Sequence, residues 1–247
     1  MRGCAVERQL FGQSERQGIN QVPIFDFSFI MQIVGGNKTF NLNCRCRSRA
    51  KRLAVVGESG SGKSLTLQLL AGLLRPQAGH VRIDDTCYGD IAQKLWSPPQ
   101  QRQVGLVFQD YALFPHLTVA QNIAFGLKRS WHTPSQKRAV WLANFWLEKM
   151  QLERVAAHYP HQISGGQRQR TALARACIAR PRWLLLDEPF AALDIGLRSQ
   201  MRQWLLQLQQ DIDLPMLLIT HDPQDSEILA EEVAIMTAGN LVHGVSE

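Results

Sequence analysis

Short apolar runs alternate with longer amphipathic stretches over most of the chain. The predicted buried strands lie at 53–56, 104–108, 183–186 and 216–219, and the predicted helices at 65–70, 168–179 and 197–210. Alternating apolar and polar residues at 40–46 and 80–84 are typical of half-buried strands. Strands that alternate with helices favour a mostly parallel sheet covered on both faces, so the predicted fold class is α/β.

The first thirty residues have a different texture. They are polar and rich in glutamine, and they show neither a sustained apolar period nor the hydrophobic stretch of a signal peptide. We therefore expect residues 1–30 to be an ill-ordered or non-native extension, with translation starting at Met31 and one domain over 31–247. Near the other end, a helix-like stretch at 227–232 and a strand at 233–236 are predicted.

A glycine-rich loop connects the predicted strand at 53–56 to the predicted helix at 65–70. It consists of Gly57, Glu58, Ser59, Gly60, Ser61, Gly62, Lys63 and Ser64, which is the strand–loop–helix setting of a P-loop. Glycines permit the tight turn and let successive N–H groups point inward, while the helix N-terminus adds partial positive charge. Lys63 is then placed to bridge the β- and γ-phosphates of a nucleotide, and the Ser64 hydroxyl to hold Mg²⁺. The alternative is a glycine-rich turn with an incidental lysine.

Polar side chains follow the other predicted core strands. Asp187 and Glu188 come directly after 183–186, Gln109 follows 104–108, and His221 follows the strand at 216–219. Ligands of open α/β sheets bind at the carboxyl ends of the strands, so these groups can converge on one nucleotide. Asp187 is suited to hold Mg²⁺ through water, and Glu188 to act as the general base for an attacking water. Gln109 can reach Mg²⁺ and that water, and His221 the γ-phosphate, although ordinary hydrogen bonding is the alternative for both.

Charge and cysteine content narrow the classes of partner. A formal net charge of +6 suits a protein that handles polyanions, whether nucleotide, nucleic acid or acidic lipid. The basic cluster at 45–52 lacks interleaved aromatic residues, so a solvated strand edge is favoured over a nucleic-acid patch. Five cysteines without zinc-type spacing favour buried apolar roles and a reducing cytosol. No apolar run approaches the ~20 residues of a membrane span, so a membrane role is expected to be peripheral.

Taken together, six motifs resemble those of the ATPase subunits of ATP-binding-cassette (ABC) transporters. In chain order they are Walker A at 57–64, the Q-loop at 107–110, the signature at 163–167, Walker B at 184–189, the D-loop at 192–194 and the H-loop at 220–222. They span nearly the whole chain after the first thirty residues. A Ser-Gly-Gly-Gln signature beside a P-loop is highly specific.

This resemblance implies a P-loop NTPase fold with a mostly parallel core sheet, an N-terminal antiparallel β part and an inserted helical subdomain at about 112–165. It also implies that two copies form a head-to-tail sandwich, with each ATP held between one P-loop and the partner's signature. The residues implied at ATP and Mg²⁺, besides those named above, are Leu65, Phe40 as a candidate adenine-stacking aromatic, Ser164, Gly165, Gly166, Gln167 and Asp194. The segment 111–116 either forms part of a groove for a permease helix or packs in the core.

Within the family, 113–119 with Asn122 and Ile123 resembles importer ATPases of the sugar, sulfate, molybdate and polyamine group. Similarity over 109–194 favours an oxyanion such as molybdate. The implied partners are an integral-membrane permease and, indirectly, a solute-binding protein, at the cytoplasmic face of the inner membrane. Two positions depart from the usual pattern, since Ile163 replaces a leucine and Ala191 a serine. The C-terminal regulatory β-domain of many such importers is not expected here.

Two other functions are weighed against import. A soluble cassette ATPase acting on nucleic acid would carry a long coiled coil or a second cassette, whereas Gln109 and Ser164 are only 164 − 109 = 55 positions apart. No nucleic-acid partner is therefore expected. A module that binds ATP without turnover is disfavoured by the presence of Glu188 and His221.

Overall fold

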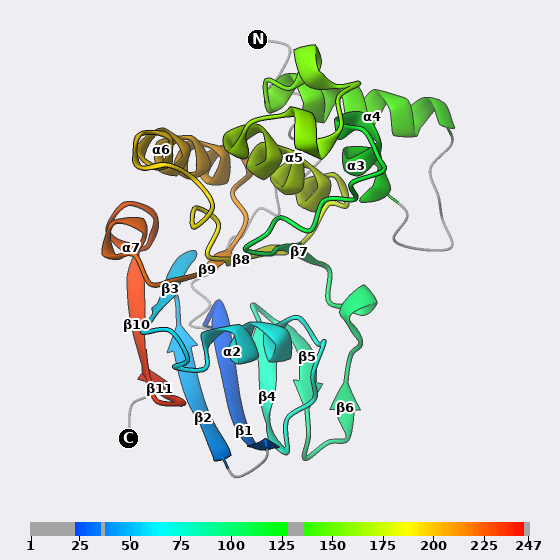
Figure 1. The fold of residues 1–247 in the computed structure, drawn as a ribbon. Coiled ribbons are helices and arrows are strands. Elements are labelled where there is room, and N and C mark those ends of the chain that lie inside the picture. The colour runs from blue at the N-terminus through cyan, green and yellow to red at the C-terminus, as the bar shows by residue number, and fades with distance from the viewer. Residues whose placement is uncertain (1–22, 36–37, 128–135, 245–247) are drawn as a thin grey trace.

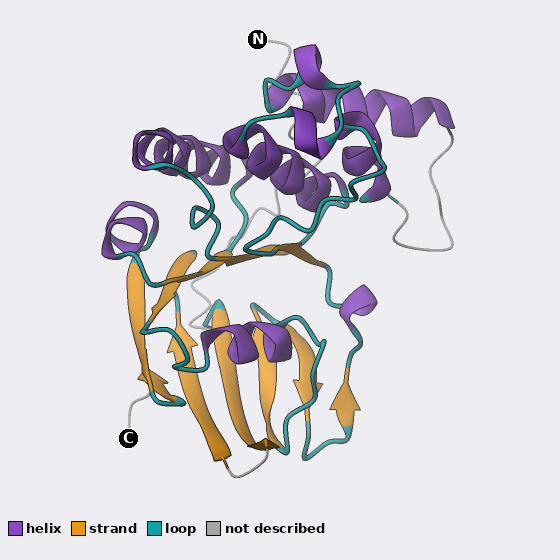
Figure 2. Cartoon of the chain, viewed as in Figure 1, coloured by secondary structure: helices purple, strands orange, loops and turns teal. Residues whose placement is uncertain are grey.

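The computed structural model describes residues 23–35, 38–127 and 136–244. Figure 1 shows a bent sheet with helix α2 (Lys63–Leu70) inside the bend, and most of the other helices gathered beyond strands β7 to β9. Figure 2 shows the same division, with most of the strands and α2 in one half of the molecule and most of the other helices in the other half. None of the described helices is long and apolar enough to cross a membrane.

The strands of the described residues form one sheet in the order β6-β5-β4-β1-β2-β11-β10-β3-β9-β8-β7. Their bounds are β1 (Phe25–Gly35), β2 (Lys38–Ser48), β3 (Arg52–Val56), β4 (Ala78–Ile83), β5 (Thr86–Asp90), β6 (Leu95–Trp96), β7 (Val104–Val107), β8 (Trp183–Asp187), β9 (Met216–Thr220), β10 (Glu232–Thr237) and β11 (Asn240–His243). The neighbours from β10 to β7 pair in parallel, whereas β1 pairs antiparallel with both β2 and β4. The predicted α/β class, with a parallel core and an antiparallel part, is confirmed.

The helices cover the parallel half of the sheet. After α2 they are α3 (Val119–Phe125), α4 (Gln136–Lys149), α5 (Gly165–Ile178), α6 (Ile195–Ile212) and α7 (Pro223–Leu229), with 3₁₀ turns η1 (Pro99–Gln101), η2 (Glu153–Val155) and η3 (Pro160–Gln162). The bounds predicted for the helix at 227–232 are wrong, because the Asp222 carboxylate accepts a hydrogen bond from the Gln224 N–H and α7 starts at Pro223, four residues earlier than expected. Glu232 already belongs to β10.

Two apolar cores lie on opposite faces of the parallel strands. Along β8, Leu184 and Leu186 join the core shared with α3 to α6, whereas Trp183 and Leu185 join the core shared with α2 and β1. This alternation follows from the two-residue period of a strand. Because both faces are covered, β8 is a continuous apolar run, as the sequence predicts for a parallel strand.

The buried Arg102 side chain fixes the C-terminal end of α2. Its Nη1 donates to the carbonyl oxygens of Leu69 (2.9 Å) and Leu70 (2.7 Å), and its Nε to that of Ser97 (3.0 Å). A cation at a helix C-terminus satisfies carbonyls that lack helical partners and interacts favourably with the helix dipole. Burial lowers the pKa of Arg102 to about 10. The helix is therefore anchored at the end opposite the glycine-rich loop.

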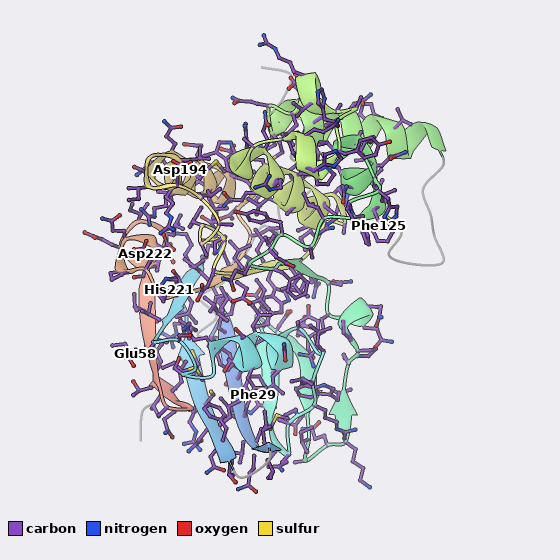
Figure 3. All side chains as sticks on the ribbon, viewed as in Figure 1. Phe29, Glu58, Phe125, Asp194, His221 and Asp222 are labelled. Atoms are coloured by element: carbon purple, nitrogen blue, oxygen red, sulfur yellow. The ribbon has the colours of Figure 1, made fainter. Side chains whose placement is uncertain are left out.

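The expected boundary between an ill-ordered extension at 1–30 and a domain starting at Met31 is wrong. Strand β1 begins at Phe25, and Phe25, Phe27 and Phe29 are fully buried among the side chains of β2, β4 and α2. Figure 3 places Phe29 within the sheet half of the molecule. The alternation at 25–29 is short, and its partner strands lie further along the chain. A chain starting at Met31 would lack these three rings, so the domain begins before that residue. Residues 1–22 lie outside the described part.

The register of β1 leads to a stability prediction. Phe27 lies opposite Cys46 on one side and Val81 on the other, with its ring in the core. Replacing it, Phe27→Ala, is expected to lower the free energy of unfolding by about 3–5 kcal/mol, because the lost ring leaves a cavity. On the same strand Ile30 is 56% exposed, so Ile30→Ala is expected to cost less than about 1 kcal/mol. Urea denaturation measures both; equal losses would contradict the burial of β1.

Candidate functional site

Hydrogen-bond register brings the ends of four core strands to one edge of the sheet. Val56 of β3 lies opposite Thr220 of β9, and Asp187 of β8 lies opposite Ile219. On the next strand along, Val107 of β7 lies opposite Leu186. The glycine-rich loop 57–64, His221, the Asp187-Glu188 pair and Gln109 therefore all leave the sheet at neighbouring points (Figure 1). The strand ends are neighbours, as the sequence predicts, and convergence of the side chains on one nucleotide stays a prediction.

The loop 57–64 presents donors at the start of α2. Gly60 and Gly62 have φ values of 79° and 108°, which favour glycine, and Gly62 is the residue that caps the helix. Lys63 folds back over the loop, where its Nζ donates to the carbonyl oxygens of Gly57 (2.6 Å) and Glu58 (2.8 Å). Among the described residues, no acceptor faces the N–H groups of Lys63 and Ser64. Such a loop suits an anion with several oxygens.

Close neighbours hold the base of this loop. The Gly239 N–H donates to the Ser61 carbonyl (2.8 Å), and a Cβ on Gly57 would overlap the carbonyl oxygen of Met236. A Cβ on Gly62 would come within 3.1 Å of the ring of Phe40. Phe40 is half-buried and packs against the α2 core, so it lies beside the loop. Stacking of Phe40 on adenine stays a prediction.

Glu188 and His221 are in direct contact. The Glu188 Oε1 and His221 Nδ1 atoms are 3.1 Å apart, with the carboxylate largely covered and the imidazole 56% exposed. Glu188 has a φ of 43°, and its N–H donates to the Ile219 carbonyl (2.8 Å), so β9 fixes the turn that carries the carboxylate. Burial raises the pKa of the neighbouring Asp187 to about 6, helped by the Glu188 charge and opposed by Lys63. The site therefore contains carboxylate charge that is only partly compensated.

The residues at this edge fit a phosphate chain with a hard cation. The Ser61 hydroxyl is buried in the loop without a hydrogen-bond partner, and Ser64 exposes its hydroxyl at the start of α2. The described part of the chain contains no group of three or more histidine, cysteine, aspartate or glutamate side chains that could hold a metal ion. A cation here would thus take its ligands from one carboxylate, hydroxyl and amide oxygens and the phosphates themselves, a set that suits Mg²⁺.

The segment that follows Gln109 is tied to two other elements. Gln109 itself is exposed in the turn after β7. The buried Tyr111 hydroxyl donates to the carbonyl of Pro189 (3.2 Å), next to Glu188. Arg175 of α5 donates to the carbonyls of Tyr111 and Ala112, both at 2.7 Å. The sequence gives no sign of these contacts, because all three acceptors are backbone carbonyls.

The residues of the signature and the D-loop begin two helices in the helical half of the molecule. Ser164 caps α5, accepting from the Gln167 N–H (3.3 Å) while the Gln167 Oε1 accepts from the Ser164 N–H (2.9 Å). The start of α5 is tightly packed, since a Cβ on Gly165 would come within 2.8 Å of Leu193. Asp194 caps α6 by accepting from the Leu197 N–H (2.9 Å). Figure 3 shows Asp194 with α6, in the helical half, and Glu58 in the sheet half.

The two groups of predicted ligands therefore do not meet in one chain. Among the described residues, no hydrogen bond or ion pair joins 57–65 to 164–167. Each chain presents one surface with the loop, the carboxylates and His221, and a second surface with the exposed start of α5.

Three charged residues close to His221 were not predicted from the sequence. Arg198, Arg202 and Asp225 form an ion-pair network with Asp222, the last residue of the H-loop motif. The signal available in the sequence was the spacing of two arginines four apart on one predicted helix, which places them on one face. Their acceptors on α7 were not predictable from it.

Comparison with known proteins gives the family. A family model described as ABC transporter matches residues 40–191. The chain is 44% identical over 191 residues to the probable sulfate/thiosulfate import ATP-binding protein CysA of Chlorella vulgaris, covering 77% of each chain. It is 43% identical over 193 residues to the sulfate/thiosulfate import ATP-binding protein CysA of Synechocystis sp., covering 77% of this chain and 52% of that one.

A polyamine relative and a solved structure extend the comparison. Identity to the spermidine/putrescine import ATP-binding protein PotA of Nitrosomonas europaea is 43% over 188 residues, covering 76% of this chain and 50% of that one. The chain thus spans about half the length of most of the curated relatives it matches. The dimeric post-hydrolysis state of the ATP-binding cassette MJ0796, bound to ADP and Pi, superposes with a TM-score of 0.72 at 28% identity, covering 87% of this chain and 96% of that chain. The chain belongs to the ABC transporter family and is an ABC ATPase.

Proposed function

We propose that this chain is the ATP-binding subunit of an importer, and that it hydrolyses ATP in a head-to-tail dimer to drive solute uptake through a membrane permease. The observation that carries the proposal is the 3.1 Å contact between Glu188 and His221 beside the loop 57–64. A general base must lie near the attacked phosphate, and a module that only binds ATP needs no such pair.

Each residue at the sheet edge has a role in this proposal. The N–H groups of the loop and Lys63 bind and orient the phosphates, and Glu188 accepts the proton of the attacking water. His221 contacts the γ-phosphate from the side next to Glu188. When bound, Mg²⁺ neutralises charge on the phosphates, and Ser64, Gln109 and Asp187 are the residues that would hold it.

The second half of the site comes from another copy. Ser164, Gly165, Gly166 and Gln167 lie at the start of the fourteen-residue helix α5, whose N–H groups and positive dipole end suit a γ-phosphate. The partner's Asp194 approaches the loop from the same side. Support comes from the exposure of Ser164 and Asp194 and from the likeness to MJ0796, whose solved structure is described as dimeric.

The role in import is supported by the relatives, which are named as import ATP-binding proteins for sulfate/thiosulfate or for spermidine/putrescine. We propose an oxyanion as the solute. Molybdate, favoured from the sequence, belongs to that class, although the names of these relatives support sulfate and thiosulfate instead. The permease would hold the subunit at the cytoplasmic face of the membrane, and a solute-binding protein would deliver the solute.

An ATPase acting on nucleic acid is less well supported. Two cations of the basic cluster at 45–52 are already paired, Lys51 with Asp213 (2.6 Å) and Arg52 with Glu231 (3.0 Å). Paired cations release fewer phosphate counterions, so they contribute less to binding a polyanion. Copurification with RNA or DNA in place of a membrane protein would favour this alternative.

Removing the lysine of the loop tests ATP binding. Lys63→Ala is expected to weaken ATP binding by about 10- to 150-fold, because hydrogen bonds to charged groups contribute about 1.5–3 kcal/mol. Isothermal titration of the purified subunit with Mg-ATP measures this change. Lys94→Ala removes an exposed lysine remote from the loop and is the matched control. Wild-type affinity in Lys63→Ala would contradict the assigned role.

Removing the proposed base tests hydrolysis. Glu188→Gln keeps the size of the side chain but cannot accept the proton, so phosphate release is expected to fall at least about 100-fold while ATP still binds. Light scattering with Mg-ATP should then detect a dimer that persists, since its ATP is not consumed. Glu227→Gln, on the exposed side of α7, should leave turnover unchanged. Undiminished phosphate release from Glu188→Gln would remove Glu188 from this role.

Uptake measurements separate the solute classes. In the source organism, deletion of the gene is expected to abolish uptake of labelled sulfate or molybdate and to leave spermidine uptake intact. Wild-type chain should restore uptake, and Glu188→Gln should not. Loss of spermidine uptake alone would replace the oxyanion with a polyamine, and unchanged uptake of all three would contradict an importer for these solutes.

A further inference from the structure

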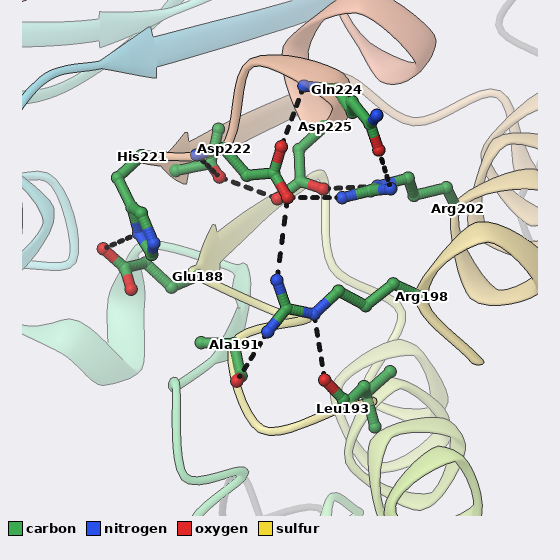
Figure 4. Close-up of polar contacts among 10 residues, drawn as sticks. Glu188, Ala191, Leu193, Arg198, Arg202, His221, Asp222, Gln224 and Asp225 are labelled. Atoms are coloured by element: carbon green, nitrogen blue, oxygen red, sulfur yellow. Dashed lines mark hydrogen bonds and ion pairs between the residues drawn. The ribbon is translucent and has the colours of Figure 1, made fainter. Parts of the chain in front are cut away.

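Two arginines on one face of α6 connect the loop before that helix to the turn that carries His221. Arg198 and Arg202 are one helical turn apart, and both approach the carboxylate of Asp222 (Figure 4). Asp222 directly follows His221 in the chain. Because Asp194 of the D-loop caps α6, which begins at Ile195, the pair lies between the D-loop and the H-loop.

Arg202 fixes the backbone on the C-terminal side of His221. It is almost fully buried, and its guanidinium donates to Asp225 Oδ1 (2.6 Å), Asp222 Oδ2 (2.6 Å) and Gln224 Oε1 (2.8 Å). On the N-terminal side of His221, the Thr220 hydroxyl donates to Asp225 Oδ2 (2.7 Å). The Asp222 N–H in turn donates to that hydroxyl (3.0 Å). Both neighbours of His221 are therefore bonded into one network, whereas the imidazole itself is exposed.

Arg198 connects this network to the D-loop. Its Nε donates to the Leu193 carbonyl (2.9 Å), its Nη2 to the Ala191 carbonyl (3.3 Å), and its Nη1 lies 3.7 Å from Asp222 Oδ2. The side chain is 29% exposed and borders a cavity of about 400 Å³. It can therefore shift without displacing packed core residues.

We propose that Arg198 and Arg202 are positioning residues that hold His221 at a fixed position relative to the D-loop. Displacement of residues 191–194 then changes the distance between His221 and Glu188. This inference rests on the proposed function, in which a second copy contacts the D-loop. Arg202 holds the turn in place, and Arg198 transmits the position of the D-loop to it. Neither arginine contacts the nucleotide.

The geometry favours positioning over a contribution to stability. Ion pairs that are partly exposed contribute little to folding, so replacing Arg198 alone should leave the fold intact. The His221 imidazole, by contrast, has one polar contact among the described residues, to Glu188. Its position is then set by its backbone, and a displacement of about 1 Å near reacting groups can cost about 100-fold in rate.

Kinetics of Arg198→Met test the proposal. With the purified full chain, kcat for ATP hydrolysis is expected to fall about 10- to 100-fold while KM stays within about two-fold, because phosphate binding by the loop is untouched. Arg198→Lys keeps the charge beside Asp222 but lacks the planar fork whose separate nitrogens bond Leu193, Ala191 and Asp222, so it should recover part of the rate. Arg154→Met removes an exposed arginine and is the matched control. A wild-type kcat in Arg198→Met would overturn the proposal, as would a change confined to KM.

Hydrogen exchange distinguishes this proposal from the proposed function. In the nucleotide-free chain, Arg198→Met should raise the rate of amide hydrogen exchange at both 190–194 and 220–224. Arg154→Met should raise it at neither segment. Faster exchange at one segment alone, or at none, would overturn the coupling. If wild-type and control chains release no phosphate, the proposed function fails, while the exchange data still decide whether the two loops are coupled.

Discussion

The parallel register of β3, β9, β8 and β7 is the constraint on which the site depends. Val56 pairs with Thr220, and Asp187 pairs with Ile219, so the carboxyl ends of these strands are level and the residues that follow them lie side by side. A shift of one residue in either pairing would exchange the side chains that face the two apolar cores, so the packing of both cores enforces this register. Packing far from the sheet edge thus fixes which polar groups meet there.

The sequence predicted the parts of the molecule that follow from local pattern. Continuous apolar runs ending in a polar residue located β8 and Asp187, and a glycine-rich loop before a helix located Lys63. Strand β1 was missed because only five residues alternate before its outward face becomes apolar as well, as at Ile30. Its assignment depends on pairing with β4, about fifty residues further along, which no local pattern contains.

The contacts that orient the site were beyond the sequence for a related reason. The hydroxyl of Tyr111 and the guanidinium of Arg102 both donate to backbone carbonyls, which every residue possesses. Any residue type can supply a backbone carbonyl, so the sequence does not show which residue accepts the hydrogen bond. The arginines of α6 were visible as a pair, but their partner Asp225 lies on another helix. Long-range polar contacts are therefore the part that only three-dimensional packing reveals.

The exposure of His221 fits the proposed division of the site between two chains. In the proposed dimer the phosphate lies between two subunits, and the imidazole that would reach it is 56% exposed in the separate chain. An exposed side chain gains little order from packing, so its order has to come from its backbone. The hydrogen bonds among Arg202, Asp225 and Thr220 fix the backbone of the turn on its buried side. Because Arg198 joins the same network to the D-loop, the exposed His221 is held by contacts that also reach the loop assigned to the proposed dimer interface.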